Sequence, residues 1–417
     1  MKTPVLPNAA ARRLFLDRHA LLDPPRGGQR PGEIADLVHR LGFVQVDSIN
    51  TVARAHDMIL WTRAPGYRPD RLRRLADRDR VLFEHWTHDA SVIPMAFLPY
   101  WKLRFTREAE RLRQKFRQWQ GGGFEDKLDE VLDHIRGHGP CGTGAVGADE
   151  ARGTGGWWDW HPSKTAIDYL WRTGRLAVTR REGFAKLFDL AERVYPPVAA
   201  ATPAETADWA CRAALDRLGF ATSGELAAFF ALVTPAEARG WCDAAARRGE
   251  IEAVEIEGAD GRLRRAWARP GTVAGAAALP QPGRRIRVLS PFDPALRDRA
   301  RAERLFGFSY RIEVFVPEPQ RRYGYYVFPV LEGDRLIGRI DTRARRGAGV
   351  LAVRAFWPEP GVAMGRGRAD RLAAELDRLA RFAGCDRVEH DAGWLRPPLP
   401  GETGQFALAQ AARRHYR

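Results

Sequence analysis

The stretch Leu41–Tyr67, LGFVQVDSINTVARAHDMILWTRAPGY, carries an amide and a carboxylate inside an apolar run, and the rest of the chain is interpreted from it. Gln45 and Asp47 lie two residues apart in FVQVDSI, a pattern that predicts a strand. Strand side chains alternate between two faces, so Gln45 and Asp47 should share one face. Aspartate is disfavoured in strands and costly to bury without partners. The pair therefore either lines a water-filled cleft or belongs to a structural network in which its polar groups are hydrogen-bonded within the protein.

The chain is strongly basic. Its 417 residues contain 67 Lys+Arg against 52 Asp+Glu, which leaves a formal net charge of +15. An excess of this size favours a polyanionic partner such as nucleic acid. A chain of this length is also too long for one ordinary hydrophobic core, so we expect two to four domains.

The cysteine pattern and the N-terminus indicate the compartment. Four cysteines lie far apart and form no Cys-x-x-Cys pair, so neither a disulfide framework nor a zinc ribbon is indicated. The N-terminus has a basic start without an apolar signal segment, and no apolar run approaches the length of a membrane span. We therefore expect a cytoplasmic, nucleoid-associated protein that uses no metal or cofactor and contacts no membrane.

The order of elements around the opening stretch is that of a winged helix. A helix over 31–41 precedes the FVQVDSI strand. Asn50 is a plausible cap for a helix from about Thr51 to Leu60. A basic amphipathic helix over 67–79 and the strand VLFEHWT follow. In a winged helix, the second long helix is the one that meets a nucleic acid groove.

The same order returns twice, and each copy closes in a hairpin. WDWHPSKTAIDYLWRTGRLAVTRREGF predicts a helix, a tight turn at Gly174 and a hairpin, and residues 206–270 predict helices followed by a hairpin that turns on Asp260-Gly261. From about residue 284, short strands such as RRIRVLS, YRIEVFV and RLIGRID predict a small antiparallel barrel or curled sheet. RADRLAAELDRLARFAG is expected to be its closing helix.

These patterns predict an α+β protein of three tandem winged-helix domains followed by a small C-terminal β-barrel-like domain with a closing helix. The expected domains are residues 1–105, which include the Gln-Val-Asp strand, and residues 106–200, 201–280 and 281–417.

Several motifs together resemble one known family. LGFVQVDSINTVARAHDMILWTRAPGY, FEHWTHDASVIPM, WWDWHPSKTAIDYLWRTGRLAVTRREGF, SPFDPALRDRARAERLFGFSYRIEVFVP and RRYGYYVFPVLEGDRLIGRID are similar to the YcaQ/AlkZ-like DNA glycosylases, over almost the whole chain. The resemblance implies a C-shaped body whose basic channel holds duplex DNA. It also implies excision of N7-alkylated purines, unhooking of interstrand crosslinks, and a monomeric state.

The catalytic motif of that family is Gln, an apolar residue, then Gln or Asp, and it corresponds here to Gln45-Val46-Asp47. The chemistry gives a separate reason for the pair. A purine alkylated at N7 is already cationic and leaves without being protonated, so what remains is an oxocarbenium-like sugar and a water to capture it. An ionised Asp47 can stabilise that sugar and accept the water's proton, while Gln45 can hold the water.

Basic and imidazole side chains of the predicted helices and hairpins are the candidate DNA contacts. They are Arg54, His56, Arg63, Arg71, Arg73, Arg74, His85, His88, Lys164, Arg180 and Arg181. The basic helix over 67–79 is half neutralised by its own aspartates, so a solvated face is as plausible there as phosphate contact.

The polar and aromatic residues allow other interpretations. Gln45 and Asp47 could satisfy backbone groups around the helix start at Asn50. Trp157, Trp158 and Trp160 could stack on bases, but aromatics ahead of a winged helix are more often core. Four side chains in FEHWTHDA could bind a metal, although their spacing matches no strong zinc signature. They are Glu84, His85, His88 and Asp89.

Three hypotheses follow. The first is a monofunctional DNA glycosylase that attacks with water, because the motif contains no catalytic lysine. The second is a non-enzymatic winged-helix DNA-binding protein or regulator, for which Asp47→Asn leaves function intact. The third is a hydrolase or binding module for another substrate, which predicts no salt-dependent affinity for duplex DNA.

Overall fold

The computed structural model describes residues 3–22, 24–120, 122–147, 150 and 160–399. Helices and strands are mixed along these residues in an α+β arrangement, as predicted. In the described part of the chain, no helix is both long enough and apolar enough to cross a membrane.

The first unit places a three-stranded sheet beside three helices. Its elements are α2 (Pro31–Leu41), β2 (Val44–Gln45), α3 (Ala55–Trp61), α4 (Pro69–Arg73), a π-helical turn (Arg74–Arg78), β3 (Leu82–Trp86) and β4 (Ala90–Pro94). The strand order is β2-β4-β3, and β4 pairs antiparallel with both neighbours. Helix α2 starts at a proline, whose missing N–H costs nothing at that position, and buries three aliphatic side chains.

The strand predicted for all of FVQVDSI is shorter than expected. Strand β2 ends at Gln45, and the N–H of Val46 makes one further bond to the Ala90 carbonyl at 2.8 Å. Beyond it, the Asp47 carboxylate accepts the N–H of Ile49 at 2.8 Å. An aspartate that bonds the backbone two residues on forms a turn, and this turn ends the strand.

The helix predicted from about Thr51 starts instead at Ala55, and Asn50 does not cap it. The carbonyl of Thr51 accepts the N–H of Ala344 at 2.8 Å, and the Val52 carbonyl accepts the side chain of an arginine of the same C-terminal hairpin. The segment between Asp47 and α3 is therefore hydrogen-bonded to the C-terminal hairpin, and it does not form the first turn of a helix.

The second unit contains a long helix that the sequence patterns above did not identify. Its elements are α5 (Leu98–Gln120), α6 (Leu128–His138), α7 (Pro162–Arg172), β5 (Leu176–Glu182), β6 (Ala185–Leu190) and α8 (Ala191–Val194). The tight turn at Gly174, with a φ of 72°, and the hairpin agree with the prediction. Trp157 and Trp158 lie outside the described residues. The ring of Trp160 lies 5.5 Å from that of Trp119.

The third unit has three helices and a hairpin, as predicted, followed by a short fourth helix. Its elements are α9 (Pro203–Leu218), β7 (Phe220–Ala221), α10 (Ser223–Phe230), α11 (Pro235–Arg247), β8 (Glu252–Glu257), β9 (Leu263–Ala268) and α12 (Thr272–Ala277). Helices α9, α10 and α11 each begin with a threonine whose hydroxyl and a glutamate three residues later close a capping box. Strand β1 (Val5–Leu6) pairs in parallel with β8, so the N-terminus completes this unit.

The C-terminal part is an open half-barrel sheet. Its elements are α13 (Pro294–Arg297), α14 (Arg299–Phe306), β10 (Ile286–Val288), β11 (Val327–Glu332), β12 (Arg335–Arg345), β13 (Val350–Pro358), α15 (Arg366–Phe382) and β14 (Arg387–His390). The strand order is β10-β11-β12-β13-β14, antiparallel except for the last pair.

The strand predicted for YRIEVFV does not form. The carboxylate of Glu313 accepts the backbone N–H groups of Arg322, Tyr323 and Gly324 at 3.0, 2.9 and 2.9 Å, which folds this segment into a loop. Strand β14, which the patterns did not identify, takes the fifth place in the sheet.

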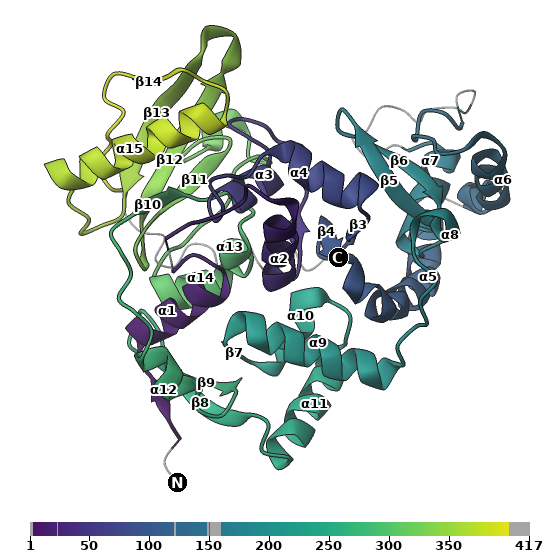
Figure 1. Cartoon of the computed structure of the whole chain (residues 1–417), viewed down its shortest axis with the longest axis horizontal. Coiled ribbons are helices and arrows are strands. Elements are labelled where there is room, and N and C mark those ends of the chain that lie inside the picture. The colour runs from purple at the N-terminus through teal and green to yellow at the C-terminus, as the bar shows by residue number, and fades with distance from the viewer. Residues whose placement is uncertain (1–2, 23, 121, 148–149, 151–159, 400–417) are drawn as a thin grey trace.

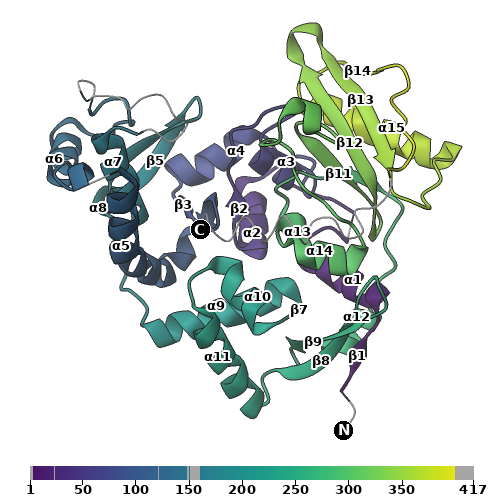
Figure 2. The same ribbon diagram turned by 180° about the vertical axis from the view of Figure 1, so that it is seen from behind.

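Figures 1 and 2 show the units following one another along an arc, with β2, β3 and β4 between the C-terminal sheet and the hairpin β5–β6. Two hydrophobic cores each contain residues from more than one of the four predicted domain ranges. Those domain boundaries stay a prediction. One core joins α1 (Asn8–Arg18) to α9, α10 and α11, and another joins α2 and α3 to the C-terminal sheet and α15. The first unit is thus held between its neighbours.

Candidate functional site

Gln45 ends β2, where its backbone pairs with Ser91 of β4. Its side chain is only 5% exposed, so both ends of the amide need partners. The Nε2 group donates to Asp89 Oδ2 at 3.3 Å, and Oε1 lies 3.0 Å from His88 Nε2. His88 and Asp89 belong to the turn between β3 and β4. Strand pairing therefore brings that turn to Gln45.

Asp47 is half-buried. Burial raises the pKa of its carboxyl group above the ordinary value, and the nearby charge of Asp89 adds to this, while the hydrogen bond from Ile49 acts in the opposite direction. Asp47 also reaches the C-terminal unit. Burial raises the pKa of the Tyr326 phenol, and the charge of Asp47 is the next cause. Asp47 is thus close enough to feel the charge of Asp89 and to act on Tyr326 of the C-terminal unit.

His88 is exposed to solvent, although its ring packs against that of Phe43, with 5.8 Å between centroids. Its Nδ1 lies 3.1 Å from Thr87 Oγ1 and 3.4 Å from a guanidinium nitrogen of Arg297. Partial burial lowers the pKa of His88 well below its ordinary value, and the guanidinium groups of Arg297 and Arg104 lower it further. The imidazole is therefore neutral at neutral pH.

Two comparisons with known proteins concern the chain as a whole. A family model described as DNA glycosylase AlkZ-like matches residues 38–382. The chain belongs to the AlkZ-like DNA glycosylase family. Its structure is also similar to that of the DNA glycosylase AlkZ from Streptomyces sahachiroi, with a TM-score of 0.63 and 17% sequence identity, covering 95% of this chain and 100% of that chain. At this identity the structural likeness concerns the fold, while family membership makes DNA the substrate.

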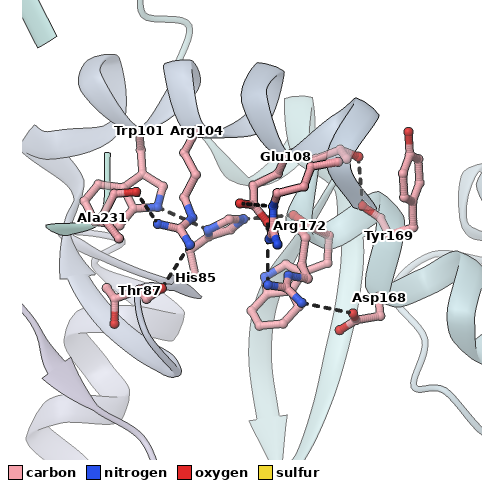
Figure 3. A network of polar contacts seen from close by, with 12 residues as sticks. His85, Thr87, Trp101, Arg104, Glu108, Asp168, Tyr169, Arg172 and Ala231 are labelled. Carbon is pink, nitrogen blue, oxygen red and sulfur yellow. Dashed lines mark hydrogen bonds and ion pairs between the residues drawn. The ribbon is translucent and has the colours of Figure 1, made fainter. Parts of the chain in front are cut away.

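Two of the candidate DNA contacts of this glycosylase were wrongly assigned. Arg63 is buried and forms a bidentate pair with Asp293, with two N–O distances of 2.8 Å. His85 is 0% exposed, and its Nδ1 accepts the indole N–H of Trp101 at 3.1 Å, as Figure 3 shows. Neither side chain is free to reach a phosphate.

Three further candidates are half-buried and already engaged. The guanidinium group of Arg54 lies 4.6 Å over the Phe184 ring, and His56 lies beside Asp57. Arg71 donates to two backbone carbonyls of the loops around the first unit. Arg54 thus packs against the second unit, whereas Arg71 holds loops within the first unit, and any contact with DNA would use only the outer edges of these side chains.

The remaining candidates lie nearer the surface. Arg73 is exposed, and Arg74 and Arg180 are exposed with a carboxylate at 3.0 and 2.9 Å respectively. Lys164 lies 4.4 Å over the Trp160 ring. Arg181 forms a bidentate pair with Glu84, both distances being 2.7 Å. A phosphate role for this group stays a prediction, and Arg73 fits it best.

The FEHWTHDA cluster does not converge on a metal. Glu84 is hydrogen-bonded to Arg181 and His85 to Trp101. The other two side chains of the cluster, His88 and Asp89, contact Gln45. No group of metal-ligating residues is found in the described part of the chain. The sequence thus singled out the two partners of Gln45 but did not indicate that they bond to it.

Proposed function

We propose that this DNA glycosylase hydrolyses the N-glycosidic bond of cationic N7-alkylated purines and unhooks interstrand crosslinks, with Gln45 and Asp47 at the reacting centre. The observation that supports this most is that a half-buried carboxylate lies two residues after a buried amide that is hydrogen-bonded at both ends. A site of this kind offers negative charge to a cationic substrate without needing a strong general acid.

In the proposed reaction the bond between the sugar C1′ and the purine N9 breaks first, and its electron pair neutralises the positive charge of the purine. The sugar becomes oxocarbenium-like, and the Asp47 carboxylate stabilises that charge. Water then forms the new C1′–O bond and gives its proton to Asp47. The raised pKa of Asp47 makes it a stronger base than an ordinary aspartate.

Water, and not an amine, is the proposed nucleophile. Lys186 carries a charge that lowers the pKa of Asp89. Its ammonium lies 3.4 Å from Glu84 and 3.5 Å from the centre of the Trp171 ring. The amine therefore binds groups of the first and second units instead of facing the sugar. This favours a monofunctional enzyme. We also propose that the protein acts as a monomer.

The test uses the purified protein beside Gln45→Ala and Asp47→Asn. Release of 7-methylguanine from duplex DNA and unhooking of an N7–N7 crosslink are measured, together with duplex affinity. Loss of both activities in both variants, with affinity kept, supports the proposal. Tight duplex binding by the parent without either activity would contradict it.

A further inference from the structure

The turn between β3 and β4 fixes the orientation of the Gln45 amide. Asp89 Oδ2, 3.3 Å from Gln45 Nε2, belongs to a carboxylate that can only accept while it is ionised. The NH₂ group of Gln45 must therefore face Asp89, which leaves Oε1 facing His88 at 3.0 Å. Since an amide oxygen only accepts, His88 Nε2 has to carry the hydrogen.

The other side of the imidazole leads to the same tautomer. A guanidinium group has donors and no acceptor, so the Arg297 nitrogen 3.4 Å away requires His88 Nδ1 to accept. The proton of the neutral ring then lies on Nε2. Two contacts on opposite sides of the ring thus agree on one tautomer.

Arginines tie this turn to the third unit. Arg297 also donates to the Phe229 carbonyl at 2.9 Å. Arg104 is buried and donates to the Thr87 carbonyl at 2.9 Å and to the Ala231 carbonyl at 3.0 Å (Figure 3). Cations at the carbonyl end of a helix are favourable, and here that end belongs to α10. The third unit thereby fixes where His88 lies.

We infer that His88 is a positioning residue, whose Nε2–H orients Gln45 so that one amide hydrogen is bound by Asp89 and the other is left to hold the attacking water. This inference rests on the proposed function. Because Oε1 of Gln45 is occupied by His88, Gln45 only donates to the water, and the proton is accepted by Asp47.

The test compares His88→Gln with His88→Leu in single-turnover release of 7-methylguanine from a duplex of known sequence. Glutamine can place an amide N–H where the imidazole Nε2–H was, whereas leucine fills similar space without a donor. His88→Leu should lower the single-turnover rate constant by about 10²-fold with little change in duplex affinity, because the amide is then free to turn. His88→Gln should recover most of that loss.

Two results would overturn the inference. One is a single-turnover rate constant of His88→Leu equal to that of the parent, and the other is an equal loss in both variants. Equal melting temperatures and duplex affinities for the two variants, measured alongside, exclude a folding defect as the cause of any difference between them. Full loss in Gln45→Ala beside full activity in His88→Leu would reject the positioning role alone, whereas a parent without activity would reject the proposed function as well.

Discussion

The buried pair of Arg63 and Asp293 offers the sharpest test of how the units are held together. The two side chains lie 230 residues apart in sequence and are 1% and 0% exposed. Arg63 also donates through Nε to the His19 carbonyl at 2.7 Å. Asp293→Asn keeps the shape but removes the charge and turns an NH₂ group or a neutral oxygen toward the guanidinium group.

Breaking a buried pair by removing one partner leaves an uncompensated charge, which costs about 3–5 kcal/mol. The matched control is Asp216→Asn. Asp216 pairs with Arg269 at a similar distance of 3.0 Å, but the two side chains are 53% and 35% exposed. An exposed pair contributes about 0–1 kcal/mol, so the same substitution should cost little there.

Urea unfolding followed by tryptophan fluorescence measures both variants. Asp293→Asn should lose several kcal/mol of unfolding free energy relative to Asp216→Asn. Adding Arg63→Met to Asp293→Asn should restore part of the loss, because the unpaired charge is then gone. Equal losses in the two single variants, or a further loss in the double variant, would refute the reasoning.

Lowering the pH should destabilise the fold through its buried histidines. Burial, with the neighbouring Arg104, lowers the pKa of His85 from 6.5 to about 3, so the unfolded chain takes up a proton that the folded chain does not. Between about pH 7.5 and 5.5 this residue alone should reduce the unfolding free energy by about 1.4 kcal/mol. His85→Gln should remove that part of the pH dependence in urea titrations, and an unchanged slope would contradict the assignment. The acid limb of kcat/KM should lie above the ordinary aspartate pKa, because that of Asp47 is raised, and Asp89→Asn should move the limb to lower pH. A limb that stays in place would show that another group titrates. Arg73→Ala and Arg180→Ala should each weaken duplex binding and reduce the salt slope by about one, as measured by fluorescence anisotropy across salt concentrations.

Local periodicity was enough to predict most elements of the units and the hairpins that close them. It failed where a distant contact determines the local structure. The FVQVDSI strand stops early because Asp47 bonds Ile49, and the next helix starts late because the Thr51 carbonyl is bonded to Ala344. Periodicity should have revealed α5, whose buried Leu112 and Phe116 lie four residues apart on one face.

The candidate site was predicted unevenly for a related reason. Gln45 and Asp47 stand out in sequence because polar residues interrupt an apolar run. Arg63 and His85 were misassigned because residue type alone does not show burial, and both lie in the interior. Arg297 could not be found at all, since it reaches His88 across 209 residues.

The most direct measurement is the single-turnover rate of 7-methylguanine release by Asp47→Asn, beside the parent and Asp70→Asn, whose aspartate is exposed on α4. If Asp47 stabilises the sugar and accepts the water's proton, its amide variant should lose about 10²–10⁴-fold in rate while duplex affinity is kept, and Asp70→Asn should match the parent. Release by Asp47→Asn at the parent rate would contradict the assignment of the chemistry to this site.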